Sequence, residues 1–90
     1  MAQFQQKIVT ITGPEKFFST STVITWGVVR AHTSNTGNIF LGATSGSEGI
    51  RLTAGSVDVY LPKYSDVSTL FVNGGGTTNK AVLLYILQDQ

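Results

Sequence analysis

Hydrophobic and polar residues alternate with a period of two along much of this chain. In the segment 56–61, for example, Val57, Val59 and Leu61 lie on one side, whereas Asp58 and Tyr60 lie on the other. A strand points successive side chains to opposite faces, so this alternation is typical of a strand with one buried face. No segment longer than a turn shows the period of 3.6 that an amphipathic helix requires. The pattern therefore predicts an all-β protein.

Seven short segments carry this alternation or a continuous apolar run, and glycine, proline and asparagine separate them. We predict strands over residues 6–12, 22–32, 38–42, 50–53, 56–61, 70–73 and 81–87. The turn 34–37 and the loop 74–80 are each expected to connect a hairpin. About seven strands at this spacing are typical of a small antiparallel β-sandwich or jelly roll. Residues 1–90 have the length of one such domain, and residues 1–6 are a candidate arm.

The predicted strand 22–32 contains the only tryptophan of the chain. Trp26 shares one side of this strand with Ile24 and Val28, which favours a place in the core. The alternative is that Trp26 forms an exposed sugar-binding platform together with Tyr60 and Tyr64. We favour the core for Trp26.

The last predicted strand, 81–87, is apolar on both faces. A two-layer domain buries one face of each sheet and leaves the other face in water. We therefore predict that one face of this strand is a surface for self-association between copies of the chain. The residues expected on that face are Leu83, Tyr85 and Leu87. The alternative is that a loop or the Phe4 end of the chain covers it.

Charge is sparse, since charged residues make up 12% of the chain and the net charge is +1. The six lysines and arginines are spread along the chain, so we expect no nucleic-acid partner. The longest apolar run, 81–87, has seven residues and is too short to span a bilayer, so we expect no membrane partner. The first six residues lack a basic region followed by an apolar stretch, which predicts synthesis and folding in a cytosol.

Few side chains in the sequence could act as catalytic groups or metal ligands. The chain has no cysteine and a single histidine, His32, and its five carboxylates are scattered. A metal site needs several such ligands close together, and a serine hydrolase needs a base beside its nucleophile. The glycine-rich loop 74–80 lacks the spacing of a phosphate-binding loop and precedes a strand, not a helix. We therefore predict no catalytic, cofactor-binding or metal-binding residues, and a protein that is not an enzyme.

Three segments carry a resemblance to a known class of proteins. They are Asn35 to Gly42 (NTGNIFLG), Gly49 to Ser56 (GIRLTAGS) and Leu70 to Asn73 (LFVN). Together with the last strand they resemble small virion proteins of tailed bacteriophages, over the stretch from residue 23 to residue 87.

This resemblance implies a structural role as a capsid decoration or cement protein that binds the major capsid protein lattice and stabilises the head. The implied place is the outer capsid surface of a virion, after synthesis in the host cytoplasm. Homo-oligomers are expected. The candidate contact residues are Leu83, Tyr85 and Leu87 for self-association and Ala2, Gln3, Phe4, Gln5 and Gln6 for a neighbouring capsid subunit. The alternative function is a tail, neck or fibre-associated binding module that recognises host glycans.

Overall fold

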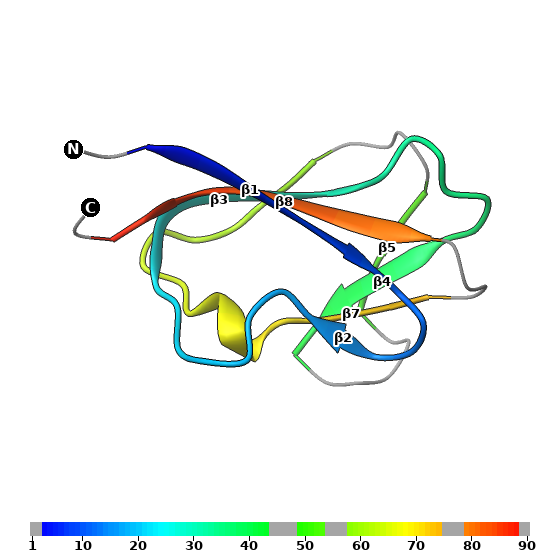
Figure 1. The fold of residues 1–90 in the computed structure, drawn as a ribbon, viewed down its shortest axis with the longest axis horizontal. Helices are drawn as coiled ribbons and strands as arrows, with labels where there is room; N and C mark the ends of the chain where they lie inside the picture. The colour runs from blue at the N-terminus through cyan, green and yellow to red at the C-terminus, as the bar shows by residue number, and fades with distance from the viewer. Residues whose placement is uncertain (1–2, 44–48, 54–57, 75–78, 89–90) are drawn as a thin grey trace.

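Two four-stranded antiparallel sheets pack against each other in the computed structural model, which describes residues 3–43, 49–53, 58–74 and 79–88 (Figure 1). Sheet A has the strand order β1-β8-β3-β6, and sheet B has the order β2-β7-β4-β5. The elements are β1 (Phe4–Thr10), β2 (Glu15–Lys16), β3 (Ile24–Ala31), β4 (Ile39–Gly42), β5 (Ile50–Leu52), β6 (Val59–Tyr60), the 3-10 turn η1 (Val67–Thr69), β7 (Phe71–Gly74) and β8 (Lys80–Leu87).

The strand pairing follows the order of a jelly roll. Strand β1 pairs with β8, β2 with β7, β3 with β6 and β4 with β5, so the first half of the chain pairs in reverse order with the second half. Successive strands lie in different sheets, except for β4 and β5. Eight strands arranged in this way over two sheets make a jelly roll. The predicted fold class is confirmed, and the strand beyond the predicted seven is the two-residue β2.

The two predicted hairpins are wrong. Strand β3 lies in sheet A and β4 in sheet B, so the turn 34–37 carries the chain from one sheet to the other. Likewise β7 lies in sheet B and β8 in sheet A. The residues predicted as strand 56–61 contain β6, whereas residues 56 and 57 lie outside the described part. Turn residues signal a reversal of the chain, but they do not say which sheet receives the next strand.

Two buried asparagines hold the crossing between β3 and β4 against the start of β8. The Asn35 amide donates to the Lys80 carbonyl over 2.8 Å, and the Lys80 N–H donates to Asn35 Oδ1 over 2.7 Å. Asn79 Oδ1 accepts from the N–H groups of Thr36 (3.0 Å) and Gly37 (3.4 Å). Buried backbone groups need such partners where the strand ladder stops. The asparagines therefore take the place of the ladder where the chain changes sheets.

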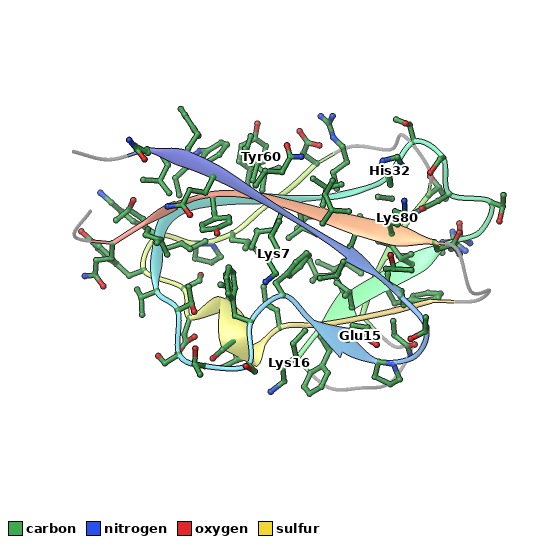
Figure 2. The ribbon with its side chains drawn as sticks, viewed as in Figure 1. Lys7, Glu15, Lys16, His32, Tyr60 and Lys80 are labelled. Atoms are coloured by element: carbon green, nitrogen blue, oxygen red, sulfur yellow. The ribbon has the colours of Figure 1, made fainter. Side chains whose placement is uncertain are left out.

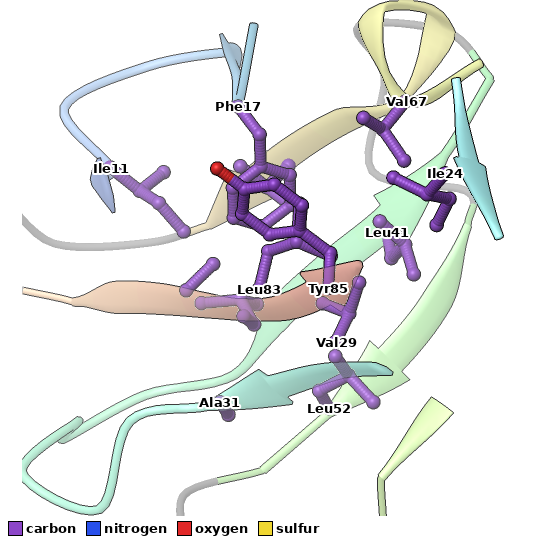
Figure 3. Packing of buried hydrophobic residues seen from close by; sticks show 13 residues of the cluster. Ile11, Phe17, Ile24, Val29, Ala31, Leu41, Leu52, Val67, Leu83 and Tyr85 are labelled. Carbon is purple, nitrogen blue, oxygen red and sulfur yellow. The ribbon is translucent and has the colours of Figure 1, made fainter. Parts of the chain in front are cut away.

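The hydrophobic core fills the space between the two sheets (Figure 3). Its residues are Ile11, Phe17, Ile24, Val29, Ala31, Ile39, Leu41, Leu52, Val67, Val72, Ala81, Leu83 and Tyr85. Leu83 is 0% exposed and Tyr85 is 6% exposed, and Leu87 is partly buried against the same core. The prediction that these three residues form an outer face is wrong, because they face the core, where sheet B and the segment between β2 and β3 cover them. Phe18 of that segment packs edge to face on Tyr85, with 5.5 Å between the ring centroids, so the alternative that a loop covers this face is confirmed in part. A strand that is apolar on both faces does not reveal which face turns inward.

The candidate arm is part of a strand from Phe4 onwards. Phe4, Gln5 and Gln6 belong to β1, which pairs along its whole length with β8. Gln3 precedes the strand and is exposed, and Ala2 lies outside the described residues. The backbone of β1 therefore contributes to sheet A instead of reaching freely toward a neighbour.

A register shift in β3 separates residues that the alternation pattern placed together. The shift lies between Ile24 and Trp26 in the pairing of β3 with β8. Ile24 points into the core and is 0% exposed, whereas Trp26 is half-buried on the opposite face of sheet A. An extra residue in one strand changes the face of the residues that follow it. The expectation that Trp26 lies in the core is wrong for this reason.

The carboxylate of Asp66 joins η1 to the segment that precedes β3. It accepts hydrogen bonds from Ser21 Oγ (2.6 Å), the Thr22 N–H (3.0 Å), the Ser68 N–H (3.0 Å) and Ser68 Oγ (2.7 Å). These four donors, with the Ser21 hydroxyl the strongest, hold the pKa of Asp66 far below its usual range. The charged carboxylate is therefore the form that the folded state requires.

We expect the stability of the protein to decline in acid because of Asp66. A lowered pKa in the folded state stabilises the fold above the unfolded pKa of about 3.9, and this contribution is lost as the pH falls below that value. Asp66→Asn should lower the free energy of unfolding at pH 7 and reduce its pH dependence between about pH 5 and pH 3. Urea unfolding of both proteins across this range is the measurement. An equal loss of stability in both proteins on acidification would contradict this role.

Adjacent leucines of β8 provide a matched test of which face is the core. Leu83 is buried between the sheets, and Leu84 is half-buried on the opposite face. Leu83→Ala should cost about 2 to 5 kcal/mol in the free energy of unfolding, because it leaves a cavity in the core. Leu84→Ala should cost about 1 kcal/mol. Urea unfolding of the two variants measures the difference, and similar costs would show that the faces are assigned incorrectly.

Candidate functional site

Side chains from four strands form three rows across the outer face of sheet A, which is the face that sheet B does not cover. Each row follows the register of the strands from β1 through β8 to β3 and, in one row, on to β6. The rows are Phe4-Ile86-Trp26, Gln6-Leu84-Val28-Tyr60 and Ile8-Val82-Arg30. Most of these side chains are apolar or aromatic. The outer face of a sheet in a small sandwich is normally polar, so this composition is unusual.

Three aromatic rings stand next to one another on this face. The Phe4 and Trp26 rings pack edge to face with 5.3 Å between their centroids, and the Trp26 and Tyr60 rings do so with 6.3 Å between theirs. Phe4 is 66% exposed and Tyr60 is 68% exposed. Tyr60 projects from the side of sheet A away from sheet B (Figure 2). Large exposed aromatic surfaces of this kind mark contact sites in soluble proteins.

A hollow with a volume of about 170 Å³ lies at the centre of the outer face. It is lined by Gln6, Trp26, Val28, Arg30, Asp58, Tyr60, Val82 and Leu84. Val28 forms part of its floor and is only 6% exposed. The hollow therefore combines an apolar floor, two aromatic walls and three polar side chains. Binding sites for small groups generally have this mixture.

A bidentate ion pair between Arg30 and Asp58 lies at one side of the hollow. Arg30 Nε donates to Asp58 Oδ1 over 2.6 Å, and Arg30 Nη2 donates to Asp58 Oδ2 over 3.1 Å. The hydrogen bond from Arg30 lowers the pKa of Asp58, and the same bond raises the pKa of Arg30. The pair is exposed, so it contributes little to stability. Its effect is to hold a carboxylate and a guanidinium in fixed positions beside the aromatic walls.

The residues that the sequence singled out as a sugar-binding platform are only partly brought together. Trp26 and Tyr60 are neighbours and both line the hollow, whereas Tyr64 does not line it. Tyr64 lies after β6 with a positive φ of 67°, and Lys63 Nζ lies 5.5 Å from the centre of its ring. The contribution of Gln6 was not predicted as part of this site, because the residue lies far away in the sequence.

His32 is held in the turn that follows β3. Its Nδ1 accepts a hydrogen bond from the Ser34 N–H over 3.0 Å, and Ser34 Oγ lies 2.7 Å from the same nitrogen. This local arrangement stabilises the turn. Among the residues that the structure describes, no group of three His, Asp or Glu side chains could hold a metal ion. The described part of the chain also contains no helix long and apolar enough to cross a membrane.

Comparisons with known proteins identify no relative. No protein-family model matches the chain, and neither a curated protein nor a solved structure matches it.

Proposed function

We propose that this chain is a structural protein of a bacteriophage virion, and that it binds the capsid protein lattice as a decoration or cement protein through the outer face of sheet A. The observation that supports this proposal most directly is the exposure of Phe4 and Tyr60 beside the half-buried Trp26. Burying such residues against a partner removes their apolar surface from contact with water, which stabilises the complex.

Two further properties agree with a structural role. Jelly rolls are common in viral coat proteins, although the same fold also occurs in lectins. The low charge of the chain, with a net charge of +1, keeps electrostatic repulsion small when many copies gather on one surface. The sequence resemblance to small phage virion proteins is the reason for naming the capsid as the partner.

Co-sedimentation with phage heads tests this proposal. Heads and tails are purified separately from phage particles assembled without the chain, and purified chain is added to each. We expect the chain to bind heads, and we expect Tyr60→Ser to weaken binding at least about tenfold, because an aromatic contact residue is commonly worth more than 1.4 kcal/mol.

Tyr64→Ser is the matched control, since Tyr64 is also exposed but does not line the hollow. It should bind heads like the unaltered protein. Binding to tails alone would place the protein elsewhere in the particle. Equal binding by both variants and the unaltered protein would exclude the outer face as the contact.

The hollow favours a second candidate function, which is recognition of host glycans by a tail, neck or fibre-associated module. A sugar ring has an apolar face of C–H groups and an edge of hydroxyl groups. Trp26 and Tyr60 would contact the apolar face, while Asp58 accepts and Arg30 and Gln6 donate hydrogen bonds to the hydroxyl groups. Lectins built on jelly rolls show that this fold can carry such sites.

A glycan array separates this candidate from the first. If the hollow binds sugar, one or more glycans should retain the protein, and Trp26→Ala and Tyr60→Ala should each abolish retention while Tyr64→Ala does not. Trp26 is the only tryptophan, so its fluorescence should shift when a retained glycan is added to the unaltered protein. Absence of binding to every glycan on the array would count against this candidate and leave the protein-binding role in place.

A further inference from the structure

One sheet edge differs from the others in length. Sheet A ends in β1 and β6, and sheet B ends in β2 and β5. Strand β1 has seven residues, whereas β6 and β2 have two each and β5 has three. Its pairing with β8 runs without a register shift. Proteins usually avoid long, regular edge strands, because their free backbone groups can pair with another chain.

The hydrogen bonds of the ladder show which backbone groups of β1 are directed away from β8. The Ile11 N–H donates to the Asn79 carbonyl over 2.8 Å, and these two residues continue the register of β1 with β8. In an antiparallel pair, alternate residues direct both backbone groups toward the same neighbour. The odd-numbered residues of β1 therefore direct their N–H and C=O groups toward β8. Phe4, Gln6 and Ile8 direct theirs away from β8, toward the open edge of the sheet.

We propose that two copies of this chain pair antiparallel through β1, about a two-fold axis at Gln6. In this register Gln6 lies opposite Gln6 of the second copy, and Phe4 lies opposite Ile8 of the second copy. All of these residues have outward backbone groups, so each opposed pair can exchange two hydrogen bonds. The two four-stranded A sheets become one continuous sheet of eight strands.

The side chains favour a second copy in this register. Phe4 is 66% exposed and Ile8 is 46% exposed, and an aromatic residue opposite a β-branched residue stabilises an antiparallel pair. Lys7 lies opposite Gln5 of the second copy. An axis at Lys7 would instead place two lysines opposite each other, which is unfavourable. With the two-fold axis at Gln6, the apolar residues of β1 in one copy thus lie opposite apolar residues of β1 in the other.

This pairing goes beyond the proposed function, and it also changes what the outer face can do. Phe4, Gln6 and Ile8 stand at one end of the three rows of that face. Joining two copies there places two hollows on one surface, related by the two-fold axis. A dimer can then engage two sites on a lattice at once, which increases the overall affinity without new types of contact.

Single cysteines test the register, since the chain contains no cysteine of its own. Opposed residues of a hydrogen-bonded antiparallel pair have Cα atoms about 5.5 Å apart, which lies within the range for a disulfide. Gln6→Cys should therefore form a disulfide-linked dimer under mild oxidation. Thr10→Cys is the control on the same strand, because its two copies would lie about 27 Å apart along the strands and should form little dimer.

Sedimentation of Gln6→Pro is the second measurement. Proline at this position removes an N–H that faces away from β8, and proline is tolerated on such an edge. The variant should keep the circular dichroism spectrum of the unaltered protein, while its dimer dissociation constant should rise at least about tenfold. A monomeric unaltered protein at all concentrations tested would overturn the proposal. Equal cross-linking of Gln6→Cys and Thr10→Cys, or equal dimerisation of a folded Gln6→Pro, would also overturn it.

Discussion

The structure depends on how a strand that is apolar on both faces fits into a domain of two layers. Strand β8 lies between β1 and β3 in the middle of sheet A. Its inner residues, such as Leu83, pack against the core, and sheet B removes them from water. A second layer can cover only one face of a sheet. The residues on its other face, such as Leu84, therefore have to be sheltered by side chains of their own sheet.

Aromatic residues provide part of this shelter. Trp26 and Tyr60 stand beside Val28, which is nearly inaccessible to solvent although it belongs to the outer face. The aromatic rings themselves remain partly or largely exposed. The small apolar side chains are thus covered, but the aromatic side chains that cover them expose apolar surface of their own. This is the physical reason why the outer face is suited to a partner, whether that partner is a protein surface, a sugar ring or, at the β1 edge, a second copy.

Hydrogen bonds of short polar side chains hold the parts of the chain that the sheets do not. The crossing between β3 and β4 depends on the amides of Asn35 and Asn79, and η1 depends on hydroxyl and backbone donors to Asp66. The chain is poor in charge and rich in serine and threonine. Short polar side chains of this type satisfy local backbone groups at turns and crossings. They do so without the like-charge repulsion that would oppose association between copies.

Local patterns in the sequence determined much of the secondary structure. Alternation and turn residues located seven of the eight strands, because the faces of a strand repeat every two residues. They missed β2, since Glu15 and Lys16 are too few to show a period. The sequence also identified β8 as apolar on both faces, and it named Trp26 and Tyr60 as residues that could act together.

The tertiary structure decided which face of each strand is covered and which distant residues meet. It turned Leu83 and Tyr85 inward, and the register shift in β3 turned Trp26 outward. It also brought Gln6 into the same hollow as Tyr60, although 54 positions separate them in the sequence. These outcomes depend on pairing between strands and on the packing of one sheet against the other. Such interactions join residues that are remote along the chain, so no local pattern of hydrophobic and polar positions records them.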